Sequence, residues 1–341
     1  MSKLIIGVDL GGTRIRAALA DGEGRILRRA GCPTLAEEGP ERVIGRIKGA
    51  IREAASSTDW AQVVGIGIGA PGPLNPWTGV IHHAPNLPGW RDVPLRDIIQ
   101  EEFQMPTYLG NDANVAALAE HRFGAGQGVD DLIYMTVSTG IGGGVIVGGQ
   151  LLLGADGLAG EVGHMTLEPH GPRCNCGNIG CLEALAAGPA IARDARQRIE
   201  EGARTAIVDL VGGDLSQVTA KVVGQAAQEG DELAIELIRR AGFYIGVGIV
   251  NLIHLFNPRL FVIGGGVSKV GDLLFDPIRA VVRERAMPAM REVRIVPATL
   301  GDDVGLLGAV ALAMEAQAAN PSRFANLADP CYNFPHDTPT R

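Results

Sequence analysis

The chain repeats one arrangement of strands and glycine turns, and this repeat limits the folds open to it. Near the start, the apolar run Leu4–Val8 leads into Asp9-Leu-Gly-Gly-Thr13 and then into a second apolar run. Much later, Leu132–Val137 leads into Ser138-Thr-Gly-Ile-Gly-Gly-Gly144 and another apolar run. Each half is typical of a strand, a glycine turn, a strand, a tight hairpin turn and a third strand. The repeat predicts two similar sheets whose glycine turns close on one ligand from opposite sides.

The rest of the sequence alternates between helical and strand-like segments, which predicts an α/β fold. At 341 residues the chain is long enough for two domains of ordinary size. After Asn320 the sequence is polar and proline-rich without periodicity, which predicts a tail, 320–341, outside the folded core. We expect strands at 63–68, 107–109, 260–263 and 293–297, and helices at 41–55, 97–103, 114–122, 188–200, 217–229, 231–256 and 305–318.

Composition excludes several partners and compartments. The net charge is −8, the aromatic content is 4%, and no dense run of Lys and Arg occurs, so we expect neither nucleic acid nor an anionic membrane as a partner. Two uncharged stretches, 132–155 and 241–258, are interpreted as soluble core, with Gly242 and Gly246 allowing close helix packing. The first residues do not form a signal peptide, and the cysteine pattern favours a reducing compartment, so we expect a cytoplasmic protein.

The two glycine turns suit a polyphosphate such as that of ATP. Glycine lets the backbone approach and bend around a phosphate, and its N–H groups are donors. Asp9, at a strand end, is placed to hold Mg²⁺ or its water shell. One such turn alone is as easily an ordinary hairpin, but two in a repeated frame favour phosphate binding. A third turn after the 260–263 strand is a weaker candidate to accept the nucleoside. The nucleotide-binding candidates are Asp9, Gly11, Gly12, Thr13, Ser138, Thr139, Gly140, Gly142, Gly264, Gly265 and Gly266.

Other nucleotide-binding motifs fit poorly. The sequence contains no Walker A motif, which argues against a P-loop enzyme. Gly65-Ile-Gly-Ile-Gly-Ala-Pro-Gly72 has the glycine spacing of a dinucleotide-binding fold, but Pro71 and Pro73 fall where its helix has to begin. We therefore expect neither class.

Three of the five cysteines crowd into the segment Cys174-Asn-Cys176-Gly-Asn-Ile-Gly-Cys181. With His164 upstream as the fourth ligand, they form a Cys₃His set that fills the coordination of zinc, which indicates a structural ion and not a catalytic one. The alternative is a loop of unmetallated thiols. Cys32 and Cys331 are interpreted as ordinary thiols.

The chain resembles the actin-like ATPase superfamily in four motifs: Asp9-x-Gly-Gly-Thr13, Ser138-Thr-Gly140, Gly264-Gly-Gly-Val267 and Gly305-Leu-Leu-Gly-Ala309. Within it, residues 3 to about 318 resemble the ROK family (repressors, open reading frames, kinases). Glu161-Val-Gly-His164 with Cys-x-Cys-Gly-x-x-Gly-Cys-x-Glu183 resembles the family's zinc signature. The resemblance implies a ribonuclease H-like fold with a duplicated βββαβα core: a small lobe, 1–112 with about 303–319, and a large lobe, 113–302, with a zinc loop, 164–183.

The same resemblance implies an ATP-dependent sugar kinase with Asp112 as the catalytic base. A hexose needs buried side chains that both donate to and accept from its hydroxyls. Any one of these side chains alone is more often a solvated loop residue or an N-cap, and Asp112 could simply cap the helix expected to start near Asn114. The implied sugar-binding residues are Gly72, Asn86, Asn111, Asp112, Glu161, His164 and Glu183, with one ring nitrogen of His164 on zinc and the other toward the sugar.

The segment Asn86-Leu-Pro-Gly-Trp90 resembles that of the family's glucokinases, so glucose is the expected sugar. Pro88 and Trp90 would limit space near the sugar 2-position, although Trp90 is as easily a core anchor. Mannose, fructose and N-acetylmannosamine are the alternative sugars, and polyphosphate is the alternative donor. Rival functions are a sugar-sensing repressor, for which we see no N-terminal helix-turn-helix before Asp9, and a nucleotide-switched filament protein. The family also suggests a homo-oligomer, a dimer or tetramer.

Overall fold

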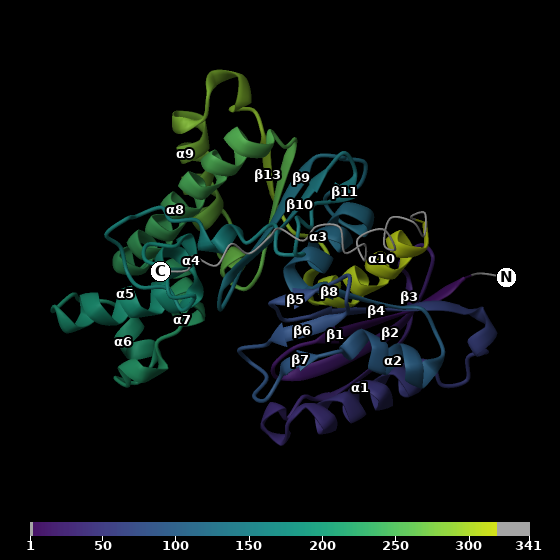
Figure 1. Ribbon diagram of the computed structural model, residues 1–341. Helices are drawn as coiled ribbons and strands as arrows, with labels where there is room; N and C mark the ends of the chain where they lie inside the picture. The colour runs from purple at the N-terminus through teal and green to yellow at the C-terminus, as the bar shows by residue number, and fades with distance from the viewer. Residues whose placement is uncertain (1–2, 319–341) are drawn as a thin grey trace, which may run out of the picture.

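A computed structural model describes residues 3–318, and the expected tail lies outside these described residues. Two five-stranded sheets dominate the fold (Figure 1). The first sheet has the strand order β3-β2-β1-β4-β8 and the second has the order β11-β10-β9-β12-β13. Strands of the first sheet are β1 (Leu4–Leu10), β2 (Arg14–Asp21), β3 (Ile26–Pro33), β4 (Val63–Ala70) and β8 (Thr107–Asn111); those of the second are β9 (Leu132–Val137), β10 (Ile141–Val147), β11 (Gln150–Leu151), β12 (Leu260–Gly264) and β13 (Arg294–Pro297).

The predicted duplication is visible in the order of the strands. In each sheet three consecutive strands run antiparallel, and the first of them pairs on its other side with a parallel strand from later in the sequence. The fold is thus the expected α/β architecture with a repeated sheet. The division into lobes at 112/113 and about 302/303 stays a prediction.

Helices surround the two sheets. The last helix returns to the first sheet, where it packs on β1 and β4 and against the helix that follows β8. The helices are α1 (Pro40–Ala54), α2 (Leu95–Phe103), α3 (Asp112–Phe123), α4 (Leu182–Ala186), α5 (Gly188–Glu200), α6 (Ile207–Leu210), α7 (Ala220–Gln228), α8 (Glu232–Phe256), α9 (Asp272–Arg285) and α10 (Val304–Ala318). Short 3₁₀ turns occupy Ala36–Glu38, Trp60–Gln62, Val162–His164, Leu215–Gln217, Val267–Val270, Pro288–Met290 and Gly301–Asp303.

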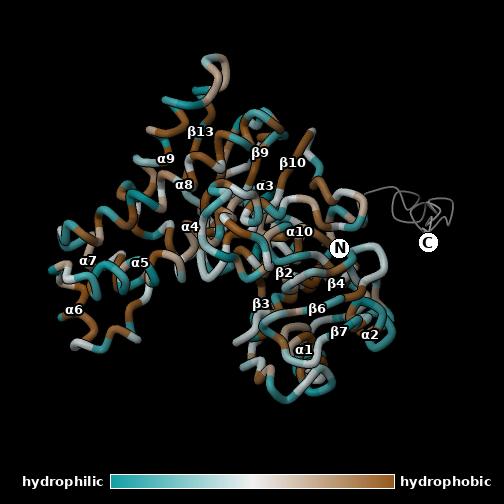
Figure 2. The backbone as a smooth tube through the Cα atoms, turned by 60° about the vertical axis from the view of Figure 1, so that its left-hand side comes forward, coloured by the Kyte–Doolittle hydropathy of each residue, from teal (hydrophilic) through white to brown (hydrophobic). Residues whose placement is uncertain are grey.

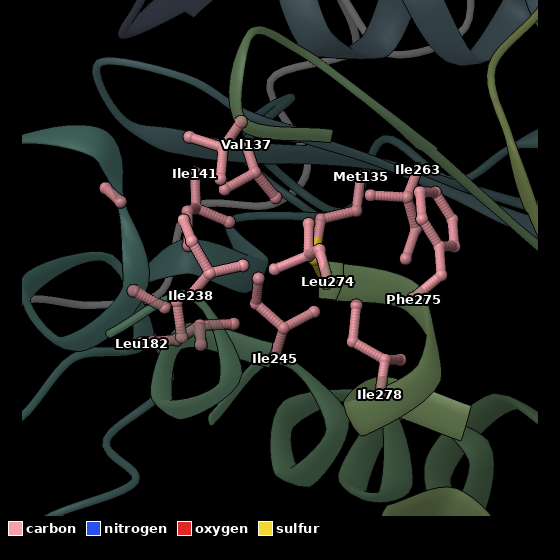
Figure 3. Close-up of a cluster of buried hydrophobic side chains, with 14 of the residues drawn as sticks. Met135, Val137, Ile141, Leu182, Ile238, Ile245, Ile263, Leu274, Phe275 and Ile278 are labelled. Atoms are coloured by element: carbon pink, nitrogen blue, oxygen red, sulfur yellow. The ribbon is translucent and has the colours of Figure 1, made fainter. Parts of the chain in front are cut away.

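The hydrophobic core of the second sheet is built from aliphatic side chains of strands and helices far apart in sequence. Figure 3 shows Met135 and Ile263 of the sheet facing Leu274 and Phe275 of α9 and Ile245 of α8. Helices α8 and α9 approach closely because Gly246 has no side chain: a Cβ there would lie 2.7 Å from Val281 Cβ. In Figure 2 the hydrophilic segments lie mainly at the periphery, as at α2.

Helix α8 contains most of the uncharged stretch 241–258, for which soluble core is expected. Its N-terminus is capped by Asp231, whose side chain accepts from the N–H of Ala234, and it ends at Asn257 in the left-handed region. Across residues 3–318, no helix has the combination of length and apolar character needed to cross a membrane.

Three local expectations need correction. The helix expected at 217–229 begins at Ala220, because the Thr219 hydroxyl caps it and the residues before form a separate 3₁₀ turn. The helix expected at 114–122 begins at Asp112 and is capped by Asn111, so Asp112 is not its cap. A small third sheet, β5 (Leu74–Asn75), β6 (Val80–His83) and β7 (Arg91–Val93), was not expected, because its strands are too short to show periodicity.

Candidate active site

Asp112 lies at the N-terminus of α3, where the chain leaves the first sheet. The Asn111 side chain accepts hydrogen bonds from the N–H groups of Ala113 and Asn114 at 3.0 and 3.4 Å, which fixes the first turn of α3. Asp112 Oδ1 accepts from the N–H of Ala113 at 2.8 Å. Asp112 is exposed at the protein surface, although enough protein surrounds its carboxylate to reduce its hydration.

The surroundings of Asp112 favour its neutral form. Loss of hydration raises the pKa of Asp112 to about 6, and the negative charges of Asp9 and Glu161 add to this increase. The hydrogen bond from Ala113 acts in the opposite direction. A carboxylate with a pKa of about 6 is a stronger base than an ordinary aspartate and is still ionised at neutral pH.

The second predicted phosphate turn packs on the start of α3, and the first contacts a sugar-binding candidate. A Cβ on Gly142 would lie 2.9 Å from Ala113 Cβ, so the second turn packs on the residue that follows Asp112. A Cβ on Gly12 would lie 2.9 Å from Asn86 Cβ, so the first turn contacts a sugar-binding candidate. At both positions glycine is required for the close approach.

The third glycine turn joins the second turn from a distant part of the sequence. Gly265 has φ +90°, and a Cβ there would lie 2.3 Å from the carbonyl oxygen of Val137. A Cβ on Gly266 would lie 3.8 Å from Ser138 Oγ. The Ser268 hydroxyl donates to the Gly265 carbonyl at 2.8 Å and braces the turn. The structure thus brings together the turns predicted to bind phosphate and nucleoside.

The sugar-binding candidates divide between two groups that meet near Asp112. A Cβ on Gly72 would lie 3.1 Å from Asn111 Nδ2, so these two residues are neighbours. On the other side, Glu161 Oε2 lies 3.9 Å from His164 Nε2. Glu183 lies between two parts of the site: its Oε2 accepts from the Ile141 N–H at 3.0 Å, and its Oε1 lies 3.6 Å from Cys174 Sγ, while its contact with a sugar stays a prediction. Glu183 therefore links the second glycine turn to the cysteine cluster.

The four predicted metal ligands lie together. The ligand atoms of His164, Cys174, Cys176 and Cys181 are all within 4.8 Å of one another. Cys176 Sγ lies 3.8 Å from Cys181 Sγ, and Cys174 Sγ lies 3.8 Å from His164 Nδ1. Zinc–sulfur bonds of about 2.3 Å in a tetrahedron separate two sulfur atoms by about 3.8 Å, so the donor set fits zinc.

The orientation of His164 agrees with a double role. Its Nδ1 faces the cysteines, and its Nε2 faces Glu161. The loop that carries the cysteines bends at Gly177 and Gly180, which have φ of +94° and +69°. Burial raises the pKa of Cys174 to about 12, so a cation is needed to stabilise a cluster of thiolates here.

Three residues near the site were missed from the sequence. Arg16 donates through Nε and Nη2 to Asp9 Oδ2 at 2.9 and 2.5 Å. Thr34 is fully buried, and its hydroxyl donates to the Gly11 carbonyl at 2.7 Å, which braces the first turn. Glu120, in α3, is fully buried and holds a distant backbone segment. Of the three, only Arg16 could have been predicted from the sequence. When the strands on the two sides of the glycine turn pair as a hairpin, Arg16 lies opposite Asp9.

Trp90 belongs to the core of the first sheet. It is 1% exposed and belongs to the same hydrophobic cluster as Leu87 and Ile81, as expected for a core anchor. Pro88 and Asn86 of the same segment are exposed.

Two repeated sheets, each with a glycine turn after its first strand, and a helix α3 whose start packs on the second turn, define an actin-like ATPase fold. A family model described as "ROK family" matches residues 5–316, and the chain belongs to this family. The chain is 39% identical to a glucokinase of Thermotoga maritima over 317 residues, which covers 92% of this chain and 99% of that protein.

Two further comparisons show the range of the family. The crystal structure of a ROK family glucokinase from Streptomyces griseus, in complex with glucose and AMPPNP, superposes with a TM-score of 0.79 at 39% identity, covering 92% of this chain and 99% of the other. A xylose repressor of Caldicellulosiruptor bescii is 33% identical over 320 residues, covering 93% of this chain and 79% of the repressor. The family thus includes kinases and regulators.

Proposed function

We propose that this protein transfers the γ-phosphoryl group of ATP to the 6-hydroxyl of a hexose, with glucose as the preferred acceptor. The observation that carries the proposal is the position of Asp112. The next residue, Ala113, packs against Gly142 of the second glycine turn, and the negative charges of Asp9 and Glu161 are close enough to raise the pKa of Asp112. Similarity to glucokinases over almost the whole chain supports glucose as the substrate.

In this mechanism Asp112 orients the 6-hydroxyl and accepts its proton as the oxygen attacks the γ-phosphorus. The bond from the γ-phosphorus to the bridging oxygen breaks, and ADP leaves with the electron pair. General-base assistance of this kind accelerates reactions by about 10²–10⁴-fold. The remaining acceleration comes from positioning of the two substrates by the turns at 9–13 and 138–144.

The glycine turns supply backbone N–H groups to the ATP phosphates, and the third turn, 264–266, receives the nucleoside. Asp9 is the candidate residue for binding Mg²⁺, through the water molecules that surround the ion. Arg16 Nε and Nη2 both donate to Oδ2, so Oδ1 would be the oxygen available to hold the cation. A bound Mg²⁺ would supply charge neutralisation to the phosphates.

On the sugar side, the proposed contacts besides Asp112 are Gly72, Asn86, Asn111, Glu161, His164 and Glu183, and Glu183 also accepts a hydrogen bond from the second turn. His164, Cys174, Cys176 and Cys181 would hold a structural Zn²⁺, which fixes the tautomer and direction of the His164 ring toward the sugar.

Coupled measurement of ADP release with a panel of hexoses tests the proposal. Glucose, mannose, fructose and N-acetylmannosamine are compared with ATP as donor, and product formation with polyphosphate is measured separately. We expect the highest kcat/KM for glucose with ATP. A protein that binds glucose but releases no hexose-dependent ADP would instead be a sugar-sensing regulator, as among its repressor relatives, and the kinase proposal would be wrong.

A further inference from the structure

Glu120 is a fully buried carboxylate in α3, and its hydrogen bonds all come from outside its own helical turn. Its Oε1 accepts from the backbone N–H groups of Thr299 and Leu300 at 2.9 and 3.0 Å. Its Oε2 accepts from the N–H of Ala125 at 2.8 Å and lies 3.2 Å from the Thr299 hydroxyl. Three of these partners are backbone N–H groups, which only donate, so the set matches a carboxylate.

The backbone that Glu120 holds is one of the two places where the chain passes between the sheets. The first passage is the junction of β8 and α3 at residues 111–112, and the second is the segment between β13 and α10, at 298–303. Glu120 therefore fastens the second passage to the helix that begins at the first. Because α3 rises about 1.5 Å per residue, Asp112 lies about 12 Å along the helix from this attachment.

The contact continues from the second passage to the first phosphate turn. Two residues beyond Leu300, the Asp302 carbonyl accepts from Arg16 Nη1 at 2.5 Å. Arg16 in turn holds the Asp9 carboxylate. At the start of α10, a Cβ on Gly305 would lie 2.8 Å from the Asp9 carboxyl carbon. A continuous series of contacts thus connects Glu120 with Asp9.

We propose that Glu120 is a positioning residue that sets the orientation of the Asp9 carboxylate, by clamping residues 299–300, and through them the segment that holds Arg16, to α3. The catalytic part of this inference rests on the proposed kinase function. Asp9 and Asp112 are joined through the first sheet, because Asp9 on β1 pairs with Gly69 on β4 and Gly69 pairs with Gly110 on β8, two residues before Asp112. The sheet fixes the Asp9 backbone, whereas the Asp9 carboxylate is held by Arg16 and packs against Gly305. Loosening the clamp frees Arg16 and reorients the Asp9 carboxylate, and with it the phosphates, while the sugar-binding residues around Asp112 stay in place.

The test variant is Glu120→Gln, which keeps the size of the side chain. Its carbonyl oxygen still accepts from the two N–H groups at 299 and 300, but its NH₂ group faces the N–H of Ala125, a donor opposed to a donor. Thr299→Val is a milder variant that removes only the hydroxyl donor. Glu315→Gln is the matched control, because Glu315 is a partly buried carboxylate whose pKa burial raises to about 7 and which lies about three turns along α10 from its start at Val304.

Three quantities, kcat, glucose affinity and amide hydrogen exchange, are measured at a temperature where each variant is fully folded. We expect kcat of Glu120→Gln to fall by about 10- to 10²-fold, as for a misplacement of about 1 Å, with the affinity for glucose unchanged. We expect amide hydrogen exchange to quicken in peptides covering both 299–305 and 9–16. Thr299→Val should show the same pattern to a smaller extent, and Glu315→Gln should match the wild type.

Faster exchange at 299–305 alone, with 9–16 unchanged, would make Glu120 a local structural residue and overturn the inference. So would a wild-type kcat in Glu120→Gln, or a loss of glucose affinity equal to the loss of kcat. If Glu120→Gln fails to fold, Thr299→Val decides by the same criteria. Absence of hexose-dependent ADP release from the wild type would remove the proposed function, whereas the exchange measurement would still decide whether Glu120 controls the 9–16 turn.

Discussion

Asp9 and Arg16 face each other across the β1–β2 hairpin, and two nitrogens of the Arg16 guanidinium donate to the same carboxylate oxygen of Asp9. The arginine also donates to the Asp302 carbonyl, at the start of the return to the first sheet. One side chain thus orients the carboxylate that is proposed to face Mg²⁺ and holds the segment leading into α10.

Replacement of Arg16 should therefore affect the nucleotide side of the reaction. In Arg16→Gln the Asp9 carboxylate loses two charge-assisted hydrogen bonds, each worth about 1.5–3 kcal/mol. We expect the Mg²⁺ concentration for half-maximal activity and the KM for ATP to rise by about 10-fold, the equivalent of about 1.4 kcal/mol, with little change in KM for glucose. Initial rates over a grid of ATP, Mg²⁺ and glucose concentrations measure this. An increase confined to the KM for glucose would contradict it.

The cysteine cluster should contain one zinc ion per chain in the isolated wild-type protein, measured by metal analysis. Cys176→Ser removes one of four ligands, and losses of stability above about 4 kcal/mol are typical of removing a bound metal or an equivalent constraint. We expect this variant to lose zinc, to unfold at a lower temperature and to bind glucose more weakly, because His164 is no longer held.

Cys32→Ser is the control for the zinc prediction. Cys32 is half-buried on β3, outside the cluster, and the variant should retain zinc and glucose affinity. Wild-type protein without zinc, or zinc retained at full occupancy in Cys176→Ser, would refute the assignment of the four ligands.

The pH dependence should follow the titration of Asp112. Because its pKa is raised to about 6 and only the ionised form accepts a proton, kcat should fall as the pH decreases through about 6. Glu161 contributes negative charge that raises this pKa, so Glu161→Gln should move the acidic limb to lower pH at saturating glucose. An acidic limb that does not move in Glu161→Gln would indicate that another group controls it.

The repeated sheets could be predicted from the sequence because apolar runs and the glycine turns that follow them are visible within short segments of the chain. The sequence also predicted the His164 and cysteine cluster, since the cysteines lie on one short loop. The ligand atoms do gather within 4.8 Å in the structure. The roles of the other site residues stay predictions, although the structure brings Gly12 next to Asn86 and Gly142 next to Ala113.

What the sequence could not predict are contacts between distant segments. Glu120 and Thr299 are separated by 179 positions, and nothing in the pattern around α3 distinguishes a clamped glutamate from a solvated one. The same holds for Thr34 and Gly11, which meet because β3 returns beside the first turn. Trp90 was ambiguous for a related reason, because an isolated aromatic residue fits a core or a pocket wall equally well.

The most direct test of the central claim is the rate of phosphoryl transfer in Asp112→Asn, measured in single turnover at saturating glucose and ATP. The variant keeps the size of the side chain and removes the base, so we predict an unchanged fold and glucose affinity and a rate about 10²–10⁴-fold below the wild type. Asp209→Asn, an exposed aspartate on α6, is the matched control and should transfer phosphate at the wild-type rate. A rate in Asp112→Asn equal to that of the control would contradict the role of Asp112 as the base.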